Sequence, residues 1–280
     1  MTYANTDIKQ LYRIIQGREV PAVGFGTYEL DNKSCVEAVE TALETGYRHI
    51  DTARMYGNER EVGAAIRTSG IPREEIFLTS KVWYDELEPA NVELAVNTSL
   101  ELMDTSYLDL ALIHWPNPNI RLEDTLEKLM ELHEQGLLRH IGVSNFPTAW
   151  MKRALKCAPV FCNQVEYHPM LDQSAVHALC QEEDILLTAY SPLGQGAAMG
   201  NPTLEKIAGK HGKNTAQVAI RWLIEQENVA AIPRSGNPDH IRGNFDVFDF
   251  SLDEDDRSAI AALPKDRRQI DPEMAPEWDS

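Results

Sequence analysis

Four side chains in the first half of the chain have the chemistry needed to transfer a proton: Asp51, Tyr56, Lys81 and His114. A tyrosine has a reference pKa of about 10 and cannot act as an acid or base near neutral pH unaided. An adjacent ammonium group stabilises the phenolate, and a carboxylate holds that ammonium in place. These residues supply every part of such a proton-transfer site if the fold brings them together.

Each of the four also has an ordinary structural interpretation. Asp51 could cap a helix, and Tyr56 could be a packing residue in a loop. Lys81 follows an apolar run and could extend its ammonium to solvent, while His114 could be a hydrogen-bonded core residue. What favours catalysis is their joint position relative to the elements that must carry them.

Short β-branched or aromatic runs alternate with longer amphipathic segments along the chain. The apolar pattern predicts eight strands, at 23–25, 47–50, 76–80, 107–113, 139–143, 160–165, 185–189 and 229–232. Helices are predicted at 33–45, 59–69, 89–103, 122–135, 147–156, 173–182 and 202–226. The last of these contains a stop at Gly212 followed by a start signal at Asn214, which indicates two helices.

This alternation, without a Pro/Ser-rich linker, predicts one α/β domain over residues 1–280 with a parallel sheet. Eight strands close naturally into a (β/α)₈ TIM barrel. An open doubly wound sheet is the alternative, but Glu29 stands where the third glycine of its GxGxxG fingerprint is needed. Residues 11–21, with a turn at Gly17, predict an N-terminal β-hairpin that caps the barrel.

Polar residues fall at the predicted strand exits, where active sites of such barrels lie. Tyr56 lies in the loop just after Asp51. The strand-exit positions are Asp51, Lys81, His114, Ser144, Asn145, Gln164, Tyr190, Arg234 and Ser235. The fold would therefore gather the four candidate proton-transfer residues at one end of the barrel.

The overall charge of the chain limits its partners. A net charge of −18 opposes binding to nucleic acid or to an anionic membrane. No apolar run approaches 18 residues, and the polar N-terminus does not resemble a secretory signal, so we expect a cytoplasmic protein. The four cysteines have no metal-like spacing and receive no function.

Four motifs, in the expected order, resemble those of the aldo-keto reductase family. The segment GYRHIDTARMYGNE at 46–59 matches the family signature GYRxIDTAxxYxNE. The other three are LIHWP at 112–116, IGVSNF at 141–146 and IPRS at 232–235. The resemblance covers residues 23 to about 250, and it implies reduction of a small-molecule carbonyl compound with a nicotinamide cofactor.

The resemblance also implies roles for individual residues. Tyr56 would be the general acid, Lys81 paired with Asp51 would tune it, and His114 would orient the carbonyl group. Ser144, Asn145 and Gln164 would bind the carboxamide of the cofactor, and the ring of Tyr190 would lie against the nicotinamide. Further cofactor contacts would come from Gly26, Thr27, Ser191, Leu193, Arg234, Ser235, His240 and Asn244.

The adenosine end departs from the common family pattern of Lys-Ser followed by Arg. Here Arg234 and Ser235 are followed by His240, which is mostly neutral above a pH of about 6.5. Asn237-Pro238-Asp239 predicts a helix start that favours an anion, although Asp239 would oppose a phosphate. We expect NADPH to be preferred, with NADH use plausible.

Aromatic residues in the loops after three strands, Tyr28, Trp83 and Trp115, are the expected substrate walls. The C-terminal segment 271–279 is short and should add little wall. Its ending, APEWD at 275–279, resembles bacterial 2,5-diketo-D-gluconate reductases, including the B form. That resemblance implies small polar aldehydes, α-keto aldehydes such as methylglyoxal, or keto sugars.

Two other functions remain as alternatives. A metal-dependent barrel hydrolase could use His49, Asp51, His114 and His168, but no HxH pair completes a site, so no metal is expected. A nicotinamide-binding sensor or scaffold would share the fold without turnover. No interface motif is evident, and a monomer is the usual state implied by the family.

Overall fold

The computed structural model describes residues 11–279 and has a barrel of eight parallel strands at its centre. The strands are β3 (Phe25–Gly26), β4 (His49–Asp51), β5 (Phe77–Val82), β6 (Leu108–Ile113), β7 (Leu138–Ser144), β8 (Cys162–Glu166), β9 (Leu186–Tyr190) and β10 (Val229–Ala231). They pair in chain order from β3 to β10. The two ends of the sheet are joined because the amide of Gly24 donates to the carbonyl of Ala231 (2.8 Å). The predicted barrel and all eight strands are confirmed.

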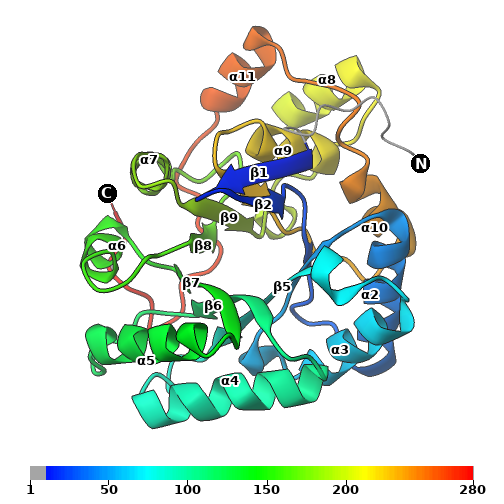
Figure 1. The fold of residues 1–280 in the computed structure, drawn as a ribbon. Helices are drawn as coiled ribbons and strands as arrows, with labels where there is room; N and C mark the ends of the chain where they lie inside the picture. The colour runs from blue at the N-terminus through cyan, green and yellow to red at the C-terminus, as the bar shows by residue number, and fades with distance from the viewer. Residues whose placement is uncertain (1–10, 280) are drawn as a thin grey trace.

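Helices surround this barrel (Figure 1). They are α2 (Asn32–Thr45), α3 (Glu59–Thr68), α4 (Pro89–Met103), α5 (Leu122–Glu134), α6 (Thr148–Ala154), α7 (Ser174–Glu182), α8 (Pro202–His211), α9 (Thr215–Ile224), α10 (Pro238–Phe245) and α11 (Glu254–Ala261). The predicted break in 202–226 is confirmed, because Gly212 ends α8 at a φ of +65° and Asn214 caps α9. The sequence interpretation missed α11, whose N-cap is Asp253.

Alternating side chains along each strand separate two apolar cores, as β6 shows. Leu110 and Leu112 pack inside the barrel, whereas Ala111 and Ile113 join the larger core between the barrel and the helices. The helices cover the outer core, and small residues allow some of them to approach closely. A Cβ at Gly63 of α3 would lie 2.4 Å from the backbone of Met103 in α4.

A hairpin closes the N-terminal end of the barrel, as predicted. Strands β1 (Tyr12–Ile15) and β2 (Arg18–Pro21) pair antiparallel, and they lie in front of the other strands in Figure 1. Ile15 and Val20 are fully buried with the barrel's interior residues, and the Arg13 guanidinium donates to the carbonyl of Val229 (2.8 Å). One end of the barrel is thus sealed by apolar packing, so a ligand must enter at the strand exits.

No helix within residues 11–279 is long and apolar enough to cross a bilayer.

Candidate active site

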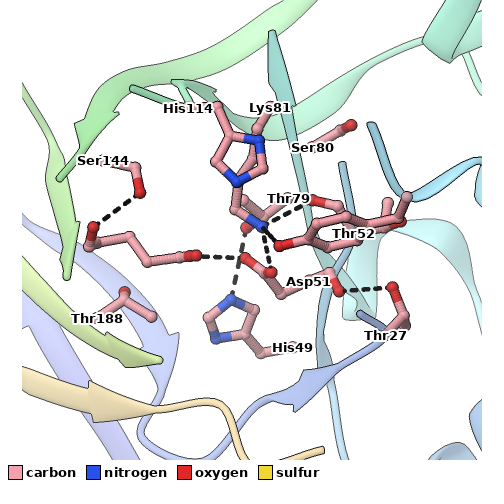
Figure 2. A network of polar contacts seen from close by, with 12 residues as sticks. Thr27, His49, Asp51, Thr52, Thr79, Ser80, Lys81, His114, Ser144 and Thr188 are labelled. Carbon is pink, nitrogen blue, oxygen red and sulfur yellow. Dashed lines mark hydrogen bonds and ion pairs between the residues drawn. The ribbon is translucent and has the colours of Figure 1, made fainter. Parts of the chain in front are cut away.

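A buried lysine connects the predicted proton-transfer residues at the strand exits. The Lys81 ammonium donates to Asp51 Oδ1 (2.5 Å), to the carbonyl of Thr52 (2.9 Å) and to the Tyr56 hydroxyl (3.2 Å). Asp51 ends β4 and Lys81 is the penultimate residue of β5, so neighbouring parallel strands place them side by side. Figure 2 shows Asp51 at the centre of this network, with His114 on one side and His49 on the other.

A short turn brings Tyr56 back over Lys81. The 3₁₀ turn Arg54–Tyr56 ends at Gly57, which has a φ of +68°. Next along the chain, the Asn58 carboxamide accepts from the Thr52 hydroxyl (2.7 Å) and donates to the carbonyls of Thr27 and Leu30 (both 2.8 Å). Asn58 therefore fixes the tyrosine turn relative to the loop after β3. The sequence analysis included Asn58 only as a letter of a motif, without a structural role.

Burial and neighbouring charges determine the protonation of this cluster. Burial raises the pKa of Tyr56 above its usual 10, and the ammonium of Lys81 opposes that rise. Burial acts to lower the pKa of Lys81, but Asp51 and Tyr56 outweigh it, so this pKa lies above its usual value. At neutral pH the site therefore holds a protonated phenol beside a charged ammonium group.

His114 lies one residue beyond β6 and packs edge-on against two aromatic rings. Its ring centroid is 5.7 Å from that of Tyr56 and 5.0 Å from that of Trp83. Burial, with a further contribution from the Lys81 charge, holds the pKa of His114 well below 6.5. The imidazole is thus neutral at physiological pH and can act as a neutral hydrogen-bonding group.

A cavity of about 950 Å³ opens above these residues. Tyr56, His114 and Asp51 line its floor, and the predicted substrate walls Tyr28, Trp83 and Trp115 all face it. Of the predicted cofactor residues, its lining includes Gly26, Thr27, Asn145, Gln164, Tyr190, Ser191, Leu193 and Arg234. The structure therefore brings the catalytic, substrate and most cofactor candidates around one space.

Four predicted cofactor residues lie outside this lining. The Ser144 hydroxyl is buried below the cavity and donates to the backbone carbonyl of Gln164 (2.8 Å). Ser235, His240 and Asn244 follow Arg234 on the way into and along α10, with His240 exposed and Asn244 buried. The helix start predicted at Asn237 is confirmed, since its side chain accepts from the amide of Asp239.

The lining of the cavity fits a nicotinamide dinucleotide. Its lining residues include amide side chains, the ring of Tyr190 and the guanidinium of Arg234, groups suited to a carboxamide, a flat ring and a phosphate. Gln164 also donates to Asp51 (2.7 Å), and Tyr190 donates to Asn145 (2.7 Å). Asn145 and Ser191 both have positive φ, a backbone strain that often accompanies ligand sites.

The C-terminal segment contributes a wall that the sequence interpretation missed. The expectation that residues 271–279 add little wall was wrong, because Asp271, Pro272 and Met274 line the cavity, together with the preceding Gln269 and Ile270. The buried carboxylate of Glu166, at the end of β8, accepts from the amides of Gln269 and Ile270 (both 2.8 Å). Irregular backbone held by one distant carboxylate has no periodic sequence signal, so the pattern could not reveal it.

The residues considered for a metal site do not form one. His168 pairs with Glu166 (3.0 Å), and His49 Nε2 lies 3.4 Å from the Thr79 hydroxyl. Within residues 11–279, no three His, Cys, Asp or Glu side chains are grouped to hold a metal ion. The arrangement gives the hydrolase alternative no ligand set.

The closed sheet of eight parallel strands, with a cavity at the strand exits, places the chain in the class of (β/α)₈ barrel proteins. Residues 22–265 match the Aldo/keto reductase family, and the chain belongs to that family. It is therefore an oxidoreductase that reduces carbonyl compounds, and members of this family generally use NAD(P)H.

Relatives align over nearly the whole chain. The glyoxal reductase of Bacillus subtilis (strain 168) is 42% identical over 266 residues, covering 94% of this chain and 96% of the relative. The methylglyoxal reductase DkgB of Escherichia coli O157:H7 is 38% identical, covering 93% and 99%. A crystal structure provisionally described as a 2,5-diketo-D-gluconic acid reductase B superposes with a TM-score of 0.94 at 38% identity, covering 97% and 99%.

Proposed function

We propose that this protein reduces small α-keto aldehydes of the glyoxal and methylglyoxal type to alcohols, with Tyr56 as the proton donor. The observation that carries the proposal is the Tyr56 hydroxyl, 3.2 Å from the Lys81 ammonium, on the floor of a cavity large enough for cofactor and substrate. Carbonyl reduction needs a hydride at carbon and a proton at oxygen. Tyr56 is placed to supply the proton.

The chain's own residues act on the carbonyl oxygen. Tyr56 donates its proton there as the C=O bond becomes a C–O–H bond, and the neighbouring Lys81 stabilises the resulting phenolate. Neutral His114 donates a hydrogen bond that orients the same oxygen. Asp51 keeps Lys81 in position, and the aromatic walls exclude water from the reacting atoms.

Asn145 and Gln164 would hold the carboxamide of the cofactor, with Tyr190 against its ring and Arg234 near the 2′-phosphate. A reduced nicotinamide bound in this way supplies the hydride. Gly26, Thr27, Ser191 and Leu193 would contact the rest of the dinucleotide. Ser144 would act at the carboxamide with Asn145 and Gln164. Ser235, His240 and Asn244 are the remaining candidate contacts, with Ser235 and His240 at the adenosine end. We propose NADPH as the preferred cofactor, with NADH also used.

The substrate class follows from the cavity and from the relatives. Trp83, Trp115 and Tyr28 provide aromatic walls, and the C-terminal segment adds further lining residues. Two relatives are named for glyoxal and methylglyoxal reduction, and a solved neighbour for a diketo sugar acid. Each of these names refers to a small compound with two carbonyl groups.

The test is steady-state reduction of methylglyoxal, a diketo sugar acid and an aromatic aldehyde with NADPH and with NADH. We expect the highest kcat/KM for methylglyoxal with NADPH. Tyr56→Phe should lower kcat at least a thousandfold, because it removes only the donated proton, while the Kd for NADPH changes less than twofold. Turnover retained by Tyr56→Phe would refute the tyrosine mechanism. Tight nucleotide binding with no turnover on any substrate would instead support the sensor alternative.

A further inference from the structure

An ion pair joins the loop after β3 to the neighbouring loop after β10. The Arg234 guanidinium, beyond β10, donates from Nη2 to the Glu29 carboxylate (2.5 Å) and from Nε to the backbone carbonyl of Tyr28 (2.6 Å). Both Glu29 and Arg234 line the cavity. The only arginine in the described lining is therefore already paired with a carboxylate.

The position of Glu29 is unusual for a glutamate. Its backbone has a φ of +58°, in the left-handed region where side chains other than Gly, Asn and Asp are disfavoured. Its side chain is 64% exposed, so apolar packing does not account for a glutamate at this site. The partner of its carboxylate in the described structure is Arg234, on the neighbouring loop after β10.

This pairing affects any phosphate that approaches Arg234. A guanidinium has a bidentate fork suited to a phosphate, but a carboxylate competes for the same donors and repels the dianion. Nearby charges do not compensate for this competition. Arg242 lies 3.6 Å from the carboxylate of Asp239, so its charge is also shared with a carboxylate.

Accepting the dinucleotide site proposed above, we propose that Glu29 is a specificity-determining residue that limits the preference for nucleotides carrying a 2′-phosphate. Glu29 competes with the phosphate for Arg234, so NADPH must displace or share that ion pair, whereas NADH need not. The affinity for NADPH is thereby reduced more than the affinity for NADH. This competition explains in physical terms how a site with a phosphate-binding arginine can still use NADH.

The test measures binding without turnover. Dissociation constants of NADPH, NADH, 2′,5′-ADP and 5′-AMP would be determined by calorimetry for the wild type, Glu29→Gln and Glu29→Asn. Asparagine tolerates the left-handed backbone, so Glu29→Asn removes the charge without adding strain. Glu19→Gln, on the hairpin at the other end of the barrel, is the matched control because it changes net charge equally.

Both Glu29 variants should raise the ratio of the Kd for NADH to the Kd for NADPH about three- to fivefold, the range expected when an exposed ion pair no longer competes. The ratio for 5′-AMP and 2′,5′-ADP should rise similarly, and Glu19→Gln should leave both unchanged. An unchanged ratio in both variants would overturn the competition. A lower ratio would also overturn it and would show that Glu29 assists phosphate binding. If the wild type bound none of these nucleotides, the proposed dinucleotide site itself would fail, together with this inference.

Discussion

Burial shifts the pKa values of Tyr56 and His114 in opposite directions, yet both shifts favour the neutral form. The phenol is held protonated by a pKa above 10, and the imidazole is held unprotonated by a pKa well below 6.5. Two neutral hydrogen-bond donors therefore face the same cavity over the physiological pH range. The positive charge of the site is confined to Lys81, one layer below, where Asp51 holds it.

The rate of carbonyl reduction should consequently show no titration step near pH 6.5. We expect kcat/KM for methylglyoxal to change less than twofold between pH 6 and pH 8, because neither Tyr56 nor His114 changes protonation there. The measurement is a pH-rate profile at constant ionic strength. His114→Gln should be slower, since glutamine orients a carbonyl less well than imidazole, but its profile should be equally flat. A step near pH 6.5 in the wild type that His114→Gln abolishes would contradict a neutral His114.

Much of the catalytic site could be predicted from residue type and position alone. Strand ends in a parallel barrel meet at one edge, so Asp51, Lys81 and His114 could be grouped without coordinates. Hydrogen-bond and ion-pair partners that depend on side-chain direction could not be predicted in this way. The pairing of Gln164 with Asp51 and of Arg234 with Glu29 requires knowing which groups face each other across loops, and sequence spacing does not contain that information.

At the scale of elements, most strands and helices were predictable because apolar periodicity and capping residues are local signals, although α11 was missed despite its N-cap at Asp253. Gly212 and Asn214 predicted the boundary between α8 and α9, and they are the caps of these two helices in the structure. The C-terminal tail has no such signal. Its placement depends on Glu166, about a hundred residues earlier, and on Asp279, whose carboxylate accepts from the amide and hydroxyl of Thr148 at the start of α6.

Glu166 should therefore control the substrate wall rather than the chemistry. Glu166→Gln keeps the size of the side chain but leaves one acceptor oxygen for the two tail amides of Gln269 and Ile270. One partly buried amide then lacks a partner, which costs about 1–3 kcal/mol, and the contact of Glu166 with His168 changes as well. We expect KM for methylglyoxal to rise about three- to tenfold while kcat stays within about threefold, and Tm to fall by several degrees. Glu205→Gln, on the exposed face of α8, is the control. A loss confined to kcat would show that Glu166 does not act through the tail.

At the scale of the whole molecule, the barrel combines an apolar base with a polar top. The hairpin residues Ile15 and Val20 seal the base, and Phe161 packs beside them. Between base and top lies His49, buried below Asp51 with its ring against Gly24, where a Cβ would come within 2.8 Å of the imidazole. A titratable side chain is thus enclosed in the middle of the barrel, where protonation adds an unfavourable buried charge.

This enclosed histidine should make the folded state sensitive to mild acid. Burial lowers the pKa of His49 to about 4, whereas it is about 6.5 in the unfolded chain, so unfolding takes up a proton between these values. The free energy of unfolding should therefore fall as pH drops from 6.5 to 4, by about 3 kcal/mol for this group. Paired carboxylates lose their contribution at lower pH, since the pKa of Asp256, despite partial burial, is lowered to about 2 by His211 and Lys210.

Urea unfolding at pH 7.5, 6 and 5 would measure the slope of the free energy of unfolding against pH for the wild type, for His49→Gln and for the exposed-site control His240→Gln. We expect His49→Gln, and not His240→Gln, to make the slope shallower; burial also lowers the pKa values of His114 and His140, so part of the slope remains. Equal slopes in all three proteins would show that His49 is not the group that takes up the proton.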